Sequence, residues 1–210
     1  MIEHADGSRS FEGCPYCEKG RELRARWQHE RVTALYSQAA IPPIFGNASL
    51  GDFPSRVTGL LHGANSVLIT GGVGVGKTHL AVGWLKAHLE DHQAGLFTTV
   101  PDLLDAIRSN YQGPGGKAEQ LINVVRDLDA VVLDDLGVEK PSDWVSEKLY
   151  QIINHRYSWQ KATVFTSNLA PDDLKERIGD RLVSRIIGMC QVLKLTGADR
   201  RIRGKGQCQP

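Results

Sequence analysis

Short apolar runs alternate with amphipathic segments along most of this chain. Five of the runs are typical of buried strands, because each is largely apolar and lies between turn-forming residues. These predicted strands are 67–70, 96–100, 130–134, 161–167 and 191–195. Apolar residues between them recur at helical spacing. The helices predicted from this spacing cover 78–92, the segment from Pro101 onward, 142–159, 171–178 and 181–187. The alternation indicates an α/β domain whose mostly parallel, five-stranded sheet is flanked by helices.

A smaller segment precedes this domain. Residues 18–38 are rich in Arg and Glu and carry apolar residues at about helical intervals, which predicts one amphipathic helix. Pro42 and Pro43 end the helical pattern, since proline has no backbone N–H to donate. We therefore expect a small N-terminal helical arm over residues 1–40 and the α/β domain over 41–210.

Composition excludes several broad classes of protein. The 210 residues are 41% hydrophobic and 23% charged, as in ordinary globular proteins, so a disordered chain is excluded. No apolar run approaches the roughly 18 residues that span a bilayer. The N-terminus also lacks the basic-then-apolar pattern of a secretory signal. These observations predict a cytoplasmic protein with no membrane partner.

Charge is unevenly distributed along the chain, although the net charge is only +1. Residues 127–147 contain seven acidic and one basic residue, a balance of −6. Residues 175–205 contain nine basic and three acidic residues, a balance of +6. The even total argues against a protein that coats nucleic acid along its whole length, and the local contrast suggests polyanion chemistry at one site.

The clearest chemical motif is a glycine-rich loop that fits the pattern G-x-x-x-x-G-K-[S/T]. It follows a predicted strand and opens a predicted helix, which is the context that the motif requires. Its positions are Gly71, Gly72, Val73, Gly74, Val75, Gly76, Lys77 and Thr78. Backbone N–H groups of such a loop cradle phosphates; Lys77 adds a mobile charge and the Thr78 hydroxyl can bind Mg²⁺. The alternative is a glycine-rich turn that binds no ligand.

Polar residues follow two of the predicted strands. Asp134 and Asp135 end an apolar strand, and the end of a parallel strand lies beside a phosphate loop. We expect Asp134 to hold Mg²⁺, through water or directly, and Asp135 to orient or deprotonate the attacking water. Asn168 follows another strand and can reach the γ-phosphate or the same water. The alternative is a solvated acid pair at the end of a strand.

The order of these motifs resembles that of AAA+ ATPases of the bacterial helicase-loader group (DnaC and DnaI), and it is similar to that of the related IstB transposition ATPases. Besides the loop, the resemblance rests on Asp-Asp-Leu-Gly at 134–137, Thr-Ser-Asn-Leu at 166–169, Gly-Asp-Arg-Leu-Val-Ser-Arg-Ile at 179–186 and Gly-Ala-Asp-Arg-Arg at 197–201. It covers about residues 41–203. It implies a P-loop NTPase fold of the AAA+ type with ATP and Mg²⁺ as ligands.

The same resemblance assigns roles to the basic C-terminal stretch. It implies that Arg185 is an arginine finger, which acts in trans at the ATP site of a neighbouring subunit in a homo-oligomer. It also implies that Arg201 occupies the sensor 2 position, with the adjacent Arg200 as the alternative. The stretch could instead be a solvated or merely DNA-attracting tail.

Cys14 and Cys17 resemble half of a zinc site, since their C-x-x-C spacing is that of a zinc knuckle. Zinc needs four ligands, and His4 and His29 lack the standard spacing for the other two. A bound Zn²⁺ and an unmetallated knuckle both remain open.

The resemblance favours an ATP-dependent loader of a replicative DNA helicase that hydrolyses ATP, contacts single-stranded DNA and holds the helicase through its N-terminal arm. A second hypothesis is an IstB-like ATPase partner of a transposase. A third is an ATP-gated interaction module with little turnover.

Overall fold

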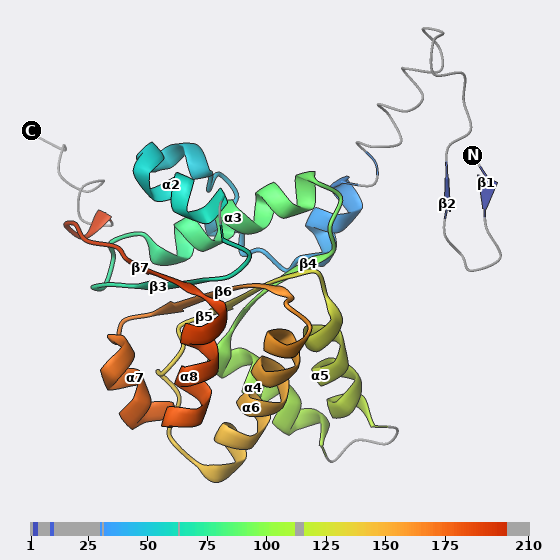
Figure 1. Ribbon diagram of the computed structural model, residues 1–210. Helices are drawn as coiled ribbons and strands as arrows, with labels where there is room; N and C mark the ends of the chain where they lie inside the picture. The colour runs from blue at the N-terminus through green and yellow to red at the C-terminus, as the bar shows by residue number, and fades with distance from the viewer. Residues whose placement is uncertain are drawn as a thin grey trace, which may run out of the picture.

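The computed structural model describes residues 2–3, 9–10, 30, 32–62, 64–111 and 116–200 (Figure 1). Cys14, Cys17 and Arg201 lie outside these residues, as does most of the predicted N-terminal helix. The predictions that rest on them therefore stay predictions. Strands β1 (Ile2–Glu3) and β2 (Arg9–Ser10) form a short antiparallel pair of their own.

A five-stranded parallel sheet forms the centre of the main domain (Figure 1). Its strands are β3 (Val67–Thr70), β4 (Gly95–Thr99), β5 (Ala130–Asp134), β6 (Ala162–Ser167) and β7 (Gln191–Lys194). They pair in the order β4-β5-β6-β3-β7. Each strand lies within one residue of the predicted run at both ends. The predicted fold class is confirmed.

Helices cover both faces of this sheet (Figure 1). On one face lie α2 (Ser55–His62), α3 (Lys77–Glu90) and the short 3-10 helices η1 (Pro43–Phe45) and η2 (Leu50–Asp52). On the other face lie α4 (Val100–Asn110), α5 (Lys117–Asp127), α6 (Asp143–Ser158), α7 (Pro171–Ile178) and α8 (Asp180–Met189). Neither α2 nor α5 is among the predicted elements. In α5 the signal was present, because buried Ala118, Ile122 and Val125 recur at helical spacing.

Each face of the sheet has its own hydrophobic core, because successive side chains of a strand point to opposite faces. In β5, Val131 and Leu133 pack with α4 to α8, whereas Val132 packs with α3. Strands buried on both faces are apolar without alternation. This is why β5 runs apolar until it reaches Asp134.

The chain before α2 packs on the α3 side of the sheet. Leu35 and Tyr36 contact that core, and Ala39 is fully buried. The backbone oxygen of Ala39 accepts a 2.8 Å hydrogen bond from the Phe97 backbone N–H, and the Tyr36 hydroxyl donates a 3.0 Å bond to Glu90. The last turn of the predicted arm is thus held against the α/β domain.

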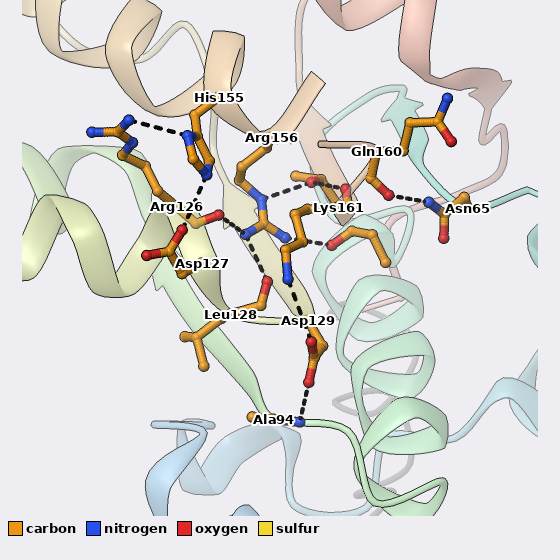
Figure 2. Close-up of polar contacts among 12 residues, drawn as sticks. Asn65, Ala94, Arg126, Asp127, Leu128, Asp129, His155, Arg156, Gln160 and Lys161 are labelled. Carbon is orange, nitrogen blue, oxygen red and sulfur yellow. Dashed lines mark hydrogen bonds and ion pairs between the residues drawn. The ribbon is translucent and has the colours of Figure 1, made fainter. Parts of the chain in front are cut away.

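Arg156 fixes the ends of β5 and β6 that lie opposite the glycine-rich loop (Figure 2). Its side chain is fully buried. The guanidinium donates to the backbone oxygens of Val125, Leu128 and Ala162 at 2.7–2.9 Å, and its Nε donates to Thr163 at 2.9 Å. Burial lowers the Arg156 pKa to about 10, so the group still carries its charge at neutral pH. Arg156 thus joins α5 and α6 to β5 and β6, the two strands that lead to the site residues.

Candidate nucleotide-binding site

The glycine-rich segment forms a loop between β3 and α3. Gly74 and Gly76 have left-handed backbones, with φ angles of 74° and 101°. At Gly71 a Cβ would lie 2.2 Å from the backbone oxygen of Leu195, so no larger residue fits there. The Arg200 backbone N–H also donates a 2.9 Å bond to the Gly74 oxygen. The segment after β7 therefore lies directly on the loop.

Lys77 connects this loop to the end of β6. Its ammonium donates to the backbone oxygens of Gly71 and Gly72 at 3.0 and 2.7 Å, and to Asn168 Oδ1 at 2.6 Å. The side chain is only 6% exposed. The structure thus brings together Lys77 and Asn168, two predicted site residues 91 positions apart. The cation lies in the loop where the phosphates of a nucleotide would bind.

Thr78 and Asp134 lie side by side beneath the same loop. The Thr78 hydroxyl contacts both carboxylate oxygens of Asp134, at 3.0 and 3.1 Å. Asp134 is buried, and burial raises the pKa of its carboxyl group; the hydrogen bond from Thr166 opposes the shift. A hydroxyl and a carboxylate are hard oxygen ligands of the kind that Mg²⁺ prefers. These two residues therefore fit the predicted magnesium site.

Thr166 is a site residue to which the sequence analysis gave no role. Its hydroxyl donates a 2.6 Å hydrogen bond to Asp134 Oδ1, and the Thr166 hydroxyl oxygen accepts a 3.0 Å bond from the Asp135 backbone N–H. The available signal was position: Thr166 lies near the end of a strand that pairs with the acid strand. Asp135 has a left-handed backbone, with φ of 58°, a conformation that aspartate adopts more readily than most residues.

A cavity of about 550 Å³ opens over the loop. Lys77, Thr78, Asp135 and Asn168 line its polar side, whereas Ile44 and Phe45 of η1 contribute an apolar wall; Val73, Gly74, Gly76, His79 and Arg200 complete the lining. Ligand sites of this size typically combine apolar walls with a few fixed polar groups. The arrangement suits a nucleotide, with phosphates at the loop and the base toward η1.

Arg200 lines this cavity, whereas Arg201 lies outside the described residues. The Arg200 guanidinium lies 4.4 Å from the centre of the Phe53 ring. His79, also in the lining, is 2.6 Å from Asp52. Among the described residues, the C-terminal arginine that lines the cavity is therefore Arg200, the alternative to Arg201 for the sensor 2 position.

Arg185 lies away from this cavity, on α8 and against α6. Its Nε donates a 2.6 Å bond to Asn154, and its guanidinium stacks on the Tyr150 ring at 4.6 Å. Within one subunit, Lys77 thus contacts Asn168 and Thr78 contacts Asp134. Arg185 of the same subunit does not reach this site. The finger assignment stays a prediction that requires a second copy of the chain.

The fold and this site define a P-loop nucleotide-binding protein of the AAA+ type. A family model described as IstB-like ATP binding protein matches residues 57–208, and the chain belongs to that family. The resemblance to DnaC/DnaI-like AAA+ proteins is thereby confirmed.

Several relatives carry the same resemblance. The chain is 25% identical over 202 residues to the replicative helicase loader DnaC of Escherichia coli (strain K12), covering 82% of each protein. It is 28% identical over 212 residues to the replicative helicase loader DnaI of Bacillus subtilis (strain 168), covering 88% of this chain and 67% of DnaI. A crystal structure of the DnaC helicase loader superposes with a TM-score of 0.66 at 28% identity, covering 74% of this chain and all of the other.

No helix among the described residues has the length and apolar character of a membrane span. Within the same residues, no group of three or more His, Cys, Asp or Glu side chains forms a metal site.

Proposed function

We propose that this protein loads a replicative DNA helicase and uses the binding and hydrolysis of ATP to do so. The observation that carries the ATP chemistry is the junction of the loop with two strand ends, through Lys77–Asn168 and Thr78–Asp134. The helicase partner is supported by the similarity to DnaC and DnaI over most of the chain. Membership of an ATP-binding family supports ATP as the ligand.

In the proposed mechanism, loop N–H groups and Lys77 bind the phosphates of ATP. Thr78 and Asp134 hold Mg²⁺, which when bound supplies positive charge to those phosphates. Asp135 accepts a hydrogen bond from the attacking water and orients it, and Asn168 holds Lys77 and the water in register. Arg200 borders the cavity and can contact a phosphate of the bound nucleotide. Arg185 of a neighbouring subunit neutralises charge that develops in the transition state, as arginine fingers do.

We propose two macromolecular contacts besides the homo-oligomer. The N-terminal arm, with or without Zn²⁺ at Cys14 and Cys17, binds the helicase. Single-stranded DNA contacts the basic C-terminal part of the domain, where Arg181 and Lys194 are exposed. Contacts between such cations and phosphates weaken as salt concentration rises.

Steady-state ATP turnover, measured with and without single-stranded DNA, tests the proposal. A helicase loader of this kind turns over ATP, and DNA changes the rate. The third hypothesis, an ATP-gated module, predicts nucleotide binding with negligible turnover in both conditions. Loss of turnover in Asp135→Asn assigns any activity seen to this site and not to a contaminant.

A pull-down separates the helicase loader from an IstB-like transposase partner. Deleting residues 1–29 removes most of the arm but keeps Leu35 and Ala39, which pack on the domain. We expect this truncated protein to bind ATP normally and to lose the replicative helicase. Full capture of the helicase by the truncated protein would place its binding surface on the AAA+ domain, and capture of a transposase by the full chain would favour the second hypothesis.

A further inference from the structure

Arg185 is held by three contacts within its own subunit. Its Nε donates a 2.6 Å hydrogen bond to Asn154 Oδ1. Its Nη1 donates a 3.2 Å bond to the backbone oxygen of Arg181, one turn earlier on α8. The guanidinium carbon lies 4.6 Å from the centre of the Tyr150 ring. Both the edge and the face of the planar group are therefore fixed.

Two of the three contacts come from one face of the neighbouring helix. Tyr150 and Asn154 are four residues apart on α6, so they lie one above the other. Helices α6 and α8 run beside each other on the same side of the sheet (Figure 1). Buried Ile153 and Ile186 anchor the two helices in a common core. The pair on α6 is thus a rigid support for a long side chain on α8.

These contacts leave a defined part of the guanidinium for an outside acceptor. Arg185 is half-buried, and within the described chain no hydrogen-bond partner faces its Nη2. A guanidinium can bind an anion bidentately through its two terminal nitrogens while Nε is bonded elsewhere. An arginine whose stem and Nε are already fixed loses less side-chain freedom when it binds.

We propose that Asn154 and Tyr150 are positioning residues, which hold Arg185 of their own subunit in the orientation that reaches the ATP site of the next subunit. This inference rests on the proposed role of Arg185 as a finger in trans. Asn154 fixes the orientation of the guanidinium, because its side-chain oxygen accepts a hydrogen bond from the edge of that group. Tyr150 packs against the face of the guanidinium. Neither residue touches the nucleotide. Both act on the rate of hydrolysis and not on the binding of ATP.

The opposite role makes the opposite prediction. If Asn154 and Tyr150 stored Arg185 in a position that it must leave, removing them would release the finger. Turnover would then rise in the variants. If they only stabilised the fold, their loss would lower turnover equally with or without Arg185.

A double-mutant cycle measured on the full chain, at concentrations where turnover depends on oligomer formation, tests the proposal. We expect Asn154→Ala to lower kcat roughly tenfold with little change in KM, the size expected for losing one bond to a charged group. Asn154→Asp keeps the acceptor oxygen but adds a negative charge beside the guanidinium, so of the conservative variants only Tyr150→Phe, which keeps the ring, should stay near the parent rate. In an Arg185→Ala background, Asn154→Ala should cause no further loss.

Gln151→Ala is the matched control, because Gln151 is another half-buried carboxamide on α6 and does not contact Arg185. Its rate should equal that of the parent, and thermal melting should show that every variant is folded. A parent rate or a raised rate in Asn154→Ala, while Arg185→Ala is impaired, would overturn the positioning role and leave the finger intact. So would an equal loss in the Arg185→Ala background. A parent rate in Arg185→Ala would instead refute the finger, and this inference with it.

Discussion

The hydroxyl of Thr166 lies 2.6 Å from Asp134 Oδ1 and donates a hydrogen bond to it. The Thr166 hydroxyl oxygen also accepts a 3.0 Å hydrogen bond from the Asp135 backbone N–H, so one side chain of β6 holds Asp134 at the end of β5 and the next residue, Asp135. Burial raises the pKa of the Asp134 carboxyl, and the bond from Thr166 keeps that rise smaller. Thr166 therefore helps to position the predicted magnesium ligand and lowers its proton affinity.

Replacing Thr166 with Val should weaken magnesium-dependent ATP binding and lower turnover. Valine has a similar shape but donates no hydrogen bond, so the Asp134 pKa should rise further. A proton and Mg²⁺ compete for the same carboxylate. On acidification, the variant should thus begin to lose ATP binding at a higher pH than the parent. Nucleotide affinity measured over a series of pH values in excess Mg²⁺ tests this.

Thr166→Ser is the control for this prediction, since it keeps the hydroxyl. It should follow the pH profile of the parent. Identical profiles for Thr166→Val and the parent would show that the hydroxyl does not tune Asp134.

Lys77→Ala should remove most of the affinity for ATP. The ammonium lies in the loop, 2.7 Å from the Gly72 oxygen, and supplies its positive charge to the phosphates. Equilibrium binding of a fluorescent ATP analogue measures the effect. Unchanged affinity would refute the assignment of residues 71–78 as the phosphate loop.

Asp135→Asn should preserve ATP binding and lower turnover. The amide keeps the shape of the carboxylate but loses the charge that orients and accepts a proton from water. Comparison of the dissociation constant with kcat separates the two effects. Hydrolysis at the parent rate would assign the proposed catalytic role to another group.

Arg156→Met should destabilise the whole domain without touching the site. Methionine fills part of the space but leaves the backbone oxygens of Val125, Leu128 and Ala162 without their donor. We expect the free energy of unfolding to fall by about 3 kcal/mol, as for several buried acceptors left unsatisfied.

Urea unfolding measures this change, with Arg126→Met as the matched control. Arg126 lies in the same network but is only half-buried, and it bonds to the His155 side chain (Figure 2). It also bonds to the Asn123 side chain. Its loss should cost less than about 1 kcal/mol. Equal stability of the two variants would show that the hydrogen bonds of Arg156 contribute little to the free energy of unfolding.

The pattern of the chain predicted what depends on local sequence. Buried strands are recognisable as apolar runs, and the glycine-rich loop has a local signature because its backbone must turn and lie close to the backbone of Leu195. The placement of Asp134, Asp135 and Asn168 beside the loop could be predicted because the ends of parallel strands meet at one edge of the sheet. Helix α5 was missed although its buried residues have helical spacing, since charged residues surround them.

Contacts between distant segments could not be predicted in this way. Thr166 is 32 residues from Asp134, and Asn154 is 31 residues from Arg185. No spacing rule relates such pairs, because the residues meet only through the pairing of β6 with β5 and the packing of α8 on α6. Arg181 and Arg185 are four residues apart on α8, a spacing that places both on one side of the helix. Arg181 is exposed, but Arg185 is half-buried because Tyr150 and Asn154 cover part of it.

A mixing experiment tests most directly the claim that ATP hydrolysis requires two copies of this chain. Arg185→Ala subunits keep an intact ATP site but lack the finger, and Asp135→Asn subunits keep the finger but lack the catalytic carboxylate. Each variant alone should bind ATP and hydrolyse it poorly. In a mixture, some interfaces combine an intact site with an intact Arg185, so turnover should recover well above that of either variant. Turnover that stays at the average of the two variants, and that rises only linearly with protein concentration in the parent, would contradict the account.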